Sequence, residues 1–252
     1  THLLPVQKKR SRNPGDSKEM VAARRRFLNA GHYQPIAAAV SRAALADLAP
    51  GATASCLDAG CGEGYYLRQL AAATSDLKTL ALLGLDISKW AILSAAKQDQ
   101  RPNWVVGSNA NLPVLPGTLD RVLCMFGFPV YAEFARVLKP DGQLLQVDAG
   151  PEHLRELREI IYPTLKPERT ADVQAPEGFT HLSTETVRYP LNLTGPEQIA
   201  DLLAMTPHLY RASAEGRAKA AALTALSVTV EVRLTRFLAR GHSHADSGTV
   251  QL

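Results

Sequence analysis

The sequence predicts an α/β protein built on a doubly wound, mostly parallel sheet, preceded by amino-terminal helices. Between residues 54 and 148, short apolar runs typical of buried strands alternate with stretches of helical periodicity. A glycine-rich turn, Cys56-Leu-Asp-Ala-Gly-Cys-Gly-Glu-Gly-Tyr-Tyr66, follows the first apolar run, and Asp86 ends the second. Strands separated by helices form a parallel sheet whose ligand lies at its carboxyl edge.

The elements follow from caps, periodicity and breakers. Two helices are predicted at about 17–30 and 34–48, because Asp16 or Ser17 can cap the first and Gly31 can end it. Strands are predicted at about 54–58, 79–86, 103–107, 119–125 and 143–148, and helices at 65–74, 89–98 and 130–138. In the turn Lys139-Pro-Asp-Gly142, the glycine is expected to take a positive φ.

Beyond residue 150 the alternation ends. A charged, proline-containing stretch to about residue 180 indicates a substrate-facing insertion, and closing strands are predicted at 184–193 and 225–238 around a helix near 196–205. We therefore expect a basic arm with helices over 1–50, a cofactor-binding core over 51–150, a substrate-facing segment with closing strands over 151–240 and a disordered tail over 241–252.

Composition is that of an ordinary globular protein. The 252 residues, 46% of them hydrophobic, suffice for one large domain with an appendage or for two small domains. No run of 18 apolar residues predicts a membrane span, and the first residues do not resemble a secretory signal, so a cytoplasmic location is expected. The sequence has three cysteines and no Cys-x-x-Cys pair, so we expect the cysteines to be small core residues. No metal site is predicted.

Positive charge is concentrated near the start of the chain. The net charge is +4, and basic residues cluster within the first 26 positions. A solvated face is the ordinary explanation, but such clustering is also the electrostatic footprint of a protein that binds a phosphate backbone. The RNA-binding candidates are Lys8, Lys9, Arg10, Arg12, Arg24 and Arg25.

The glycine-rich turn predicts a site for a cationic ligand. Gly60, Gly62 and Gly64 lack the Cβ atoms that would keep a ligand from the backbone. Their spacing differs from the G-x-G-x-x-G of dinucleotide-binding loops, and Asp58 and Glu63 would repel a phosphate. S-adenosylmethionine carries a sulfonium and an α-ammonium, which suit the carboxylates of Asp58 and Glu63. It also carries a ribose, whose two hydroxyls suit Asp86 at the end of the second strand. The alternative is a purely structural turn.

The remaining cofactor candidates come from the segment after the third strand. Gly107-Ser-Asn-Ala-Asn-Leu-Pro113 is similar to the methyltransferase pattern Gly-Asp-Ala-x-x-Leu-Pro, with Ser108 in place of the acid. The adenine amino group would then be held by the Ser108 hydroxyl or by Asn109, and Ile87 would cover the ring.

These features resemble the class I methyltransferases, and four further strings resemble a narrower family. They are Leu3-Leu-Pro-Val-Gln with Lys9-Arg-Ser-Arg-Asn-Pro-Gly-Asp16, Met20-Val-Ala-Ala-Arg24 through Phe27-Leu-Asn-Ala-Gly-His-Tyr33, Pro151-Glu-His-Leu154 and Met205-Thr-Pro207. Together with the glycine loop, they are similar to the bacterial 23S rRNA (guanine-N1)-methyltransferase family, which includes macrolide-resistance members. The resemblance extends from about residue 2 to about residue 238.

The resemblance implies an activity, partners and site residues. It implies methyl transfer from S-adenosylmethionine to N1 of a guanine in a 23S rRNA hairpin, by a homodimer that cradles the RNA. The family's cofactor contacts fall on Tyr33, Gly62, Glu63 and His153. Family members also carry a zinc module of three Cys and one His just before the Leu-Leu-Pro segment, where this sequence starts, so zinc is not carried over.

The acceptor site is expected after the fourth strand, where the sequence reads Phe126-Gly-Phe-Pro129. Phe128 or Pro129 is expected to back the target base, although the aromatic residues could instead merely close the core. N1 of guanine must lose a proton during transfer, and Asp16, His32 and Asp148 are candidate acceptors. Two other functions stay open: a small-molecule methyltransferase, and a non-catalytic RNA-binding or resistance-associated module.

Overall fold

The computed structural model describes residues 1–4, 14–49, 51–74, 79–165 and 174–241. Within them the strands are β1 Thr53–Ala59, β2 Thr79–Asp86, β3 Asn103–Val106, β4 Leu119–Met125, β5 Leu138–Ala149, β6 Phe179–Thr194 and β7 Ala225–Ala239. The helices are α1 Lys18–Asn29, α2 Gln34–Leu45, α3 Tyr65–Ala73, α4 Lys89–Gln98, α5 Tyr131–Val137, α6 Arg155–Ile161, α7 Pro196–Ala204, α8 His208–Arg211 and α9 Ala214–Ala221.

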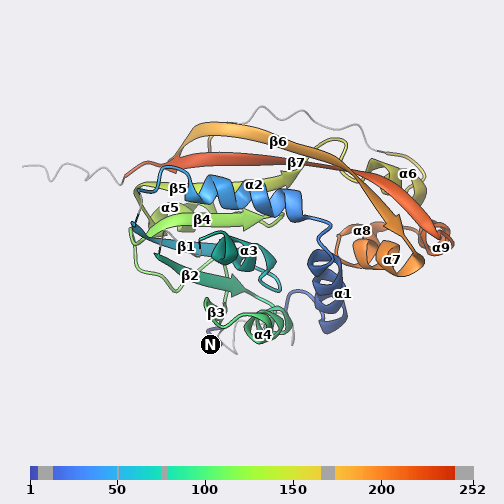
Figure 1. Cartoon of the computed structure of the whole chain (residues 1–252), viewed down its shortest axis with the longest axis horizontal. Coiled ribbons are helices and arrows are strands. Elements are labelled where there is room, and N and C mark those ends of the chain that lie inside the picture. Colours follow the sequence, from blue (N-terminus) through green and yellow to red (C-terminus); the bar gives the residue numbers. More distant parts are fainter. Residues whose placement is uncertain (5–13, 50, 75–78, 166–173, 242–252) are drawn as a thin grey trace, which may run out of the picture.

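All seven strands form one sheet in the order β3-β2-β1-β4-β5-β7-β6 (Figure 1). Strands β1 to β5 run parallel, whereas β7 is antiparallel to both β5 and β6. This confirms the predicted doubly wound, mostly parallel sheet. The strand order reverses between β1 and β4, and open α/β sheets bind their ligands at such a point, beyond the carboxyl ends of the strands.

The sheet is covered on both faces. One core contains side chains of α2, α3 and α4 together with residues of α6 and α7, and the other is built around Phe134 of α5 and Phe179 of β6. Cys56, Cys61 and Cys124 are free and buried, as expected of small core residues.

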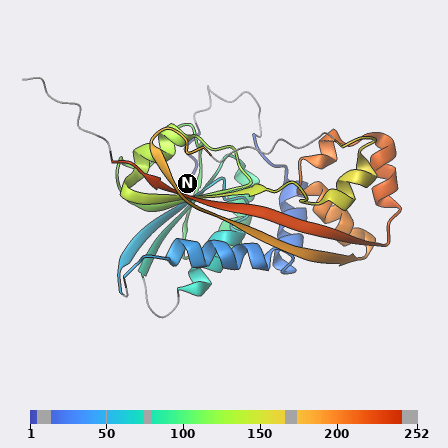
Figure 2. The same cartoon turned by 90° about the horizontal axis from the view of Figure 1, so that it is seen from above.

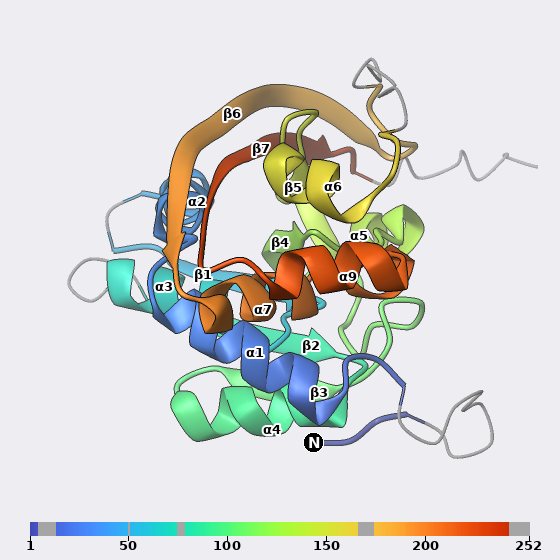
Figure 3. The same cartoon turned by 90° about the vertical axis from the view of Figure 1, so that its right-hand side faces the viewer.

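The last two strands continue far beyond the parallel core. Strands β6 and β7 pair over almost their whole length, and their far end carries α6 to α9 (Figures 1 and 2). Seen from that end, α1, α7 and α9 lie in front of the sheet (Figure 3). Arg26 of α1 joins Asp201 of α7 through two hydrogen bonds of 3.0 and 2.7 Å. The amino-terminal helix is thereby fixed against the carboxyl-terminal helices, next to the carboxyl edge of the strands.

Several expectations needed correction. The segment after residue 150 contains α6, and two further helices, α8 and α9, follow the predicted α7; all three are short. The predicted turn at Lys139–Gly142 lies within β5, where the pairing with β4 is irregular, and the positive φ of 65° belongs to Asp141, not to Gly142. A Cβ at Gly142 would lie 2.9 Å from the Lys139 carbonyl oxygen, so close packing explains the glycine. Of the expected tail over 241–252, residues 242–252 lie outside the described residues, and the division into four parts stays a prediction.

Among the described residues, none of the helices combines the length and the apolar composition that a membrane span requires.

Candidate active site

The glycine loop joins β1 to α3 in a tight bend. Gly60, Gly62 and Gly64 have φ values of 90°, 56° and 85°, which side-chain-bearing residues rarely adopt. The backbone N–H groups of Gly60 and Cys61 both donate to the Leu85 carbonyl oxygen, at 2.7 and 2.9 Å, and tie the loop to β2.

The three glycines have different roles. A Cβ at Gly64 would lie 2.5 Å from the Trp104 ring, so this glycine makes room for an aromatic side chain packed beneath the loop. At Gly60 and Gly62 the nearest side-chain atoms to an added Cβ would be 4.0 and 3.6 Å away. Only these two glycines therefore keep the upper surface of the loop open to a ligand.

Asp58 lies fully buried at the end of β1. Neither of its carboxylate oxygens has a hydrogen-bond partner. Burial, and to a lesser extent the nearby Asp86, raises the pKa of Asp58 to about 8. A buried carboxylate without a partner is costly, and an ammonium group or another donor would relieve that cost.

Asp86, at the end of β2, faces the same loop. Its carboxylate accepts the Gly62 N–H at 2.9 Å and the Ser88 N–H at 2.8 Å. Burial is the largest influence on the pKa of Asp86 and raises it. Each oxygen retains a second lone pair, which suits the two hydroxyls of a ribose.

The Glu63 carboxylate is held by two neighbouring side chains. Its Oε2 accepts hydrogen bonds from Arg68 at 2.8 Å and from Gln98 at 2.7 Å, and its side chain is fully buried. Its Oε1 is buried without a partner. The sequence missed this arrangement because Gln98 comes from α4, so direct contact between the cofactor and the Glu63 carboxylate stays a prediction.

The residues expected around adenine lie beside the loop. The Asn109 Nδ2 atom is the nearest neighbour of an added Cβ at Gly60, and Asn109 Oδ1 is buried without a partner. That oxygen could accept an exocyclic amino group. Ser108 instead uses its hydroxyl to accept the Ala110 N–H at 3.2 Å, and Ile87 is partly exposed.

Tyr33 and His153 meet at the deep end of the site. His153 Nδ1 accepts the Glu231 backbone N–H at 3.2 Å, so the proton of the neutral ring lies on Nε2, 3.4 Å from the Tyr33 hydroxyl oxygen. Burial lowers the pKa of His153 to about 4 and raises the pKa of Tyr33. The neutral imidazole can donate to Tyr33, which leaves the tyrosine proton free for a ligand.

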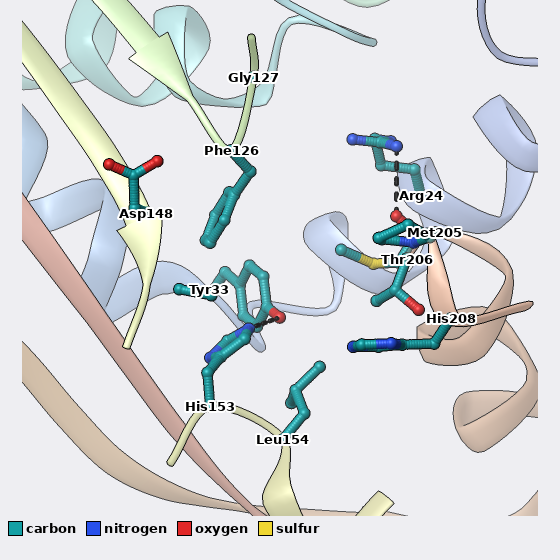
Figure 4. Close-up of a pocket in the computed structure, with 12 residues that line it drawn as sticks. Arg24, Tyr33, Phe126, Gly127, Asp148, His153, Leu154, Met205, Thr206 and His208 are labelled. Atoms are coloured by element: carbon teal, nitrogen blue, oxygen red, sulfur yellow. Dashed lines mark hydrogen bonds between the residues drawn. The ribbon is translucent and has the colours of Figure 1, made fainter. Parts of the chain in front are cut away.

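A cavity of about 280 Å³ opens beside this pair. Phe126 and Asp148 line one side, and Arg24, Met205, Thr206 and His208 line the other (Figure 4). It shares four side chains with a narrower hollow over the glycine loop: Arg24, Tyr33, Phe126 and Met205. The two hollows are therefore parts of one depression at the point where the strand order reverses.

The aromatic wall is Phe126, not Phe128. Phe126 has a φ of 52°, and its ring stacks on His153 with the centroids 5.9 Å apart. Phe128 is 91% exposed, and neither Phe128 nor Pro129 lines the cavity. The left-handed backbone at Phe126 turns its ring inward, and the residue types alone gave no sign of this conformation.

The three candidate proton acceptors lie in different places. Asp148 lines the cavity, and its Oδ2 accepts the Gln146 side-chain N–H at 2.7 Å. Asp16 forms an ion pair with Arg24 at 2.8 Å. His32 packs its ring against Phe27, with the centroids 4.7 Å apart. Of the three, only Asp148 is a cavity-lining residue.

The structure also separates the basic residues. Lys8, Lys9, Arg10 and Arg12 lie outside the described residues. Arg25 lines a different surface hollow with Trp90, whereas Arg24 turns into the candidate site. Arg24 therefore lines the candidate site, whereas Arg25 does not, and the RNA-binding role of both stays a prediction. The described residues contain no group of three or more His, Cys, Asp or Glu side chains that could hold a metal ion.

Comparisons with known proteins agree with this geometry. Residues 56–142 match a family model described as a methyltransferase domain. Among solved structures, the YcgJ protein of Bacillus subtilis matches with a TM-score of 0.53 and 20% identity, over 81% of this chain and 97% of that chain. A protein from work on thioacetal formation during echinomycin biosynthesis matches with a TM-score of 0.54 and 18% identity, over 83% of each chain. At these identities the matches establish the fold alone.

Sequence relatives are more specific. A putative 23S rRNA (guanine-N(1)-)-methyltransferase of Micromonospora griseorubida is 34% identical over 90% of this chain and 82% of its own length. A putative enzyme of the same name from Bacillus subtilis is 32% identical over 85% of this chain and 77% of its own length. The 23S rRNA (guanine(748)-N(1))-methyltransferase of Streptomyces fradiae is 30% identical over 76% of this chain and 69% of its own length. This chain therefore belongs to the 23S rRNA (guanine-N1)-methyltransferase family.

Proposed function

We propose that this protein transfers a methyl group from S-adenosylmethionine to N1 of a guanine in a 23S rRNA hairpin. The observation that carries the proposal is the continuity of the two hollows. The open surface of the glycine loop leads into a cavity walled by Phe126, Tyr33 and His153, and the partnerless Asp58 carboxylate is buried two residues before Gly60. A cation-binding surface thus adjoins a space where a flat base can lie.

The residues present fit the proposed cofactor. Gly60 and Gly62 leave space where a side chain would fill the cradle, and Asp58 offers two free acceptors for the α-ammonium. Asp86 would take the ribose hydroxyls and Asn109 the adenine amino group, while Ile87 would cover the ring. When bound, the sulfonium supplies an activated methyl group; the protein must hold the acceptor in line with it.

An extruded guanine would lie against Phe126. A base must leave its stack before chemistry at N1, and stacking on an aromatic side chain supplies ~1–3 kcal/mol of the cost. In this arrangement Asp148 is the group that accepts the N1 proton. Gln146 occupies one of its oxygens and leaves the other for the base.

RNA binding and dimerisation are parts of the same proposal. The relatives are named for rRNA substrates, and the basic arm at Lys8, Lys9, Arg10 and Arg12 can neutralise phosphates. A homodimer cradling the hairpin would present two such arms. A cytoplasmic location would give the enzyme access to ribosomal RNA.

The direct test is labelled methyl transfer. The protein is incubated with methyl-labelled S-adenosylmethionine and 23S rRNA fragments, and the digested nucleosides are separated. We expect label in 1-methylguanosine. Label at another nucleoside would contradict the proposed specificity, whereas cofactor binding without transfer to RNA would favour the non-catalytic module.

A second test concerns the arm. Replacing Lys8, Lys9, Arg10 and Arg12 by Gln should weaken rRNA binding and flatten its salt dependence, because fewer counterions are released. Affinity for S-adenosylmethionine should not change. A small-molecule methyltransferase would show no salt-dependent RNA binding in either form, and sedimentation of the intact protein would test the homodimer.

A further inference from the structure

Three consecutive arginines on α1 point in three directions. Successive residues of a helix lie about 100° apart around its axis, so neighbours face different surroundings. Arg26 pairs with Asp201, and Arg25 lines the hollow beside Trp90. Arg24 alone lines both parts of the candidate active site. Its position on the helix, not its charge, separates it from its neighbours.

Arg24 lies directly over the glycine loop. Its Cδ atom is 3.6 Å from the place where a Gly62 side chain would begin. Its Nη2 atom donates to Asp16 at 2.8 Å. The same atom donates to the Met205 carbonyl oxygen at 3.3 Å, which Figure 4 marks with a dashed line. Its Nε atom is buried and has no hydrogen-bond partner. Arginine binds carboxylates with two parallel N–H donors, and a buried, unused donor costs free energy until an acceptor arrives.

The charges around the loop leave one place for an anion. The carboxylates of Asp58, Glu63 and Asp86 lie at or beneath the loop and would repel a carboxylate ligand. Arg68 is paired with Glu63 at 2.8 Å and does not line the hollow over the loop. Among the described residues that line the hollow over the loop, Arg24 is the one cationic side chain.

The methyl donor carries an α-carboxylate beside its α-ammonium. We infer that Arg24 binds that α-carboxylate, while Asp58 faces the ammonium, so that the amino-acid end of the donor is held between opposite charges. The inference rests on the proposed function, because it names the group that recognises one end of the proposed cofactor. It removes Arg24 from the RNA-binding residues and makes it a residue that selects the cofactor.

The test compares two ligands that differ in one group. Calorimetry measures the affinity of the intact protein for S-adenosylmethionine and for decarboxylated S-adenosylmethionine, in which hydrogen replaces the carboxylate. A charge-assisted, partly buried pair predicts a wild-type preference of about 10- to 100-fold for the carboxylated ligand. In Arg24→Gln most of this preference should disappear, because affinity falls for the carboxylated ligand and stays nearly constant for the decarboxylated one.

Two further variants complete the design. Arg25→Gln removes the adjacent charge outside the site and should keep the full preference. Arg24→Lys keeps the charge without the forked geometry and should keep part of the preference. Thermal unfolding of every variant separates loss of the contact between Arg24 and the carboxylate from loss of the fold. If Arg24→Gln does not fold, the preference of the wild type for the carboxylated ligand still tests carboxylate recognition.

The outcomes are distinct. Equal affinity of the wild type for the two ligands, or a full preference retained by a folded Arg24→Gln protein, would overturn the role of Arg24 and leave the proposed methyl donor intact. Absence of heat with either ligand would overturn the proposed function and this inference together. A loss of rRNA binding in Arg24→Gln with the ligand preference intact would return Arg24 to the RNA-binding surface.

Discussion

The buried Asp58 carboxylate makes a sharp prediction about pH. In the unliganded protein its pKa is about 8, so roughly one tenth of the molecules carry an ionised Asp58 at pH 7. If the donor's ammonium binds only the ionised form, affinity should rise roughly tenfold per pH unit between about pH 5.5 and 7. The isosteric change Asp58→Asn should flatten this slope, because the amide does not titrate.

The assay is calorimetry with S-adenosylhomocysteine, the demethylated product, which separates binding from methyl transfer. Below about pH 7 the ligand's own amino group stays mostly protonated and contributes little to the slope. Repeating the titration in buffers of different ionisation enthalpy should show close to one proton released per ligand bound near pH 6.

Stability gives an independent readout with a defined sign. The pKa of Asp58 is higher in the folded than in the unfolded protein. Its favourable contribution to the free energy of unfolding is therefore complete below about pH 4 and is lost as pH rises towards 8. Asp58→Asn should lose less stability over that range. Burial also raises the pKa of Asp86, which adds a smaller effect of the same sign, and Asp86→Asn identifies that part. Parallel pH slopes for wild type and Asp58→Asn would refute the reasoning.

Two further predictions use matched pairs of variants. Gly64 and Gly31 share a φ of 85°, but only at Gly64 would a Cβ meet the Trp104 ring, at 2.5 Å. We therefore expect Gly31→Ala to lower the free energy of urea unfolding by about 1 kcal/mol and Gly64→Ala to lower it by about 1–3 kcal/mol more. Equal costs would show that the Trp104 ring shifts aside without a penalty. Phe126→Ala should raise the KM for rRNA about 5- to 150-fold, which corresponds to loss of ~1–3 kcal/mol of stacking, whereas substitution of the exposed Phe128 should matter far less. A larger effect at Phe128 would move the base away from the cavity found here.

Part of the candidate site could be predicted because it depends on local sequence. The glycine loop needs small residues and positive φ, and an acid at the end of β2 reaches that loop in any sheet of this order. The helix periodicity of α1 does not single out Arg24. Both Arg24 and Arg25 lie three or four positions from the buried Val21 and from a buried residue of the next turn.

Other features depended on contacts between distant segments. Glu63 is held by Gln98 from another helix, and the His153 tautomer is set by the backbone of Glu231, 78 residues away. Gly64 is a glycine because of Trp104, which comes from β3.

The sequence by itself determined the sheet, its cofactor edge and the family, because strand periodicity, turn chemistry and motif spacing are all encoded along the chain. Only the tertiary structure decided which side chains line the candidate site. Phe126 rather than Phe128, and Arg24 rather than Arg25, enter the site, although each pair is close in sequence and alike in chemistry. The physical reason is that a backbone torsion or a helix phase selects one neighbour for the interior, and packing against distant segments fixes that choice.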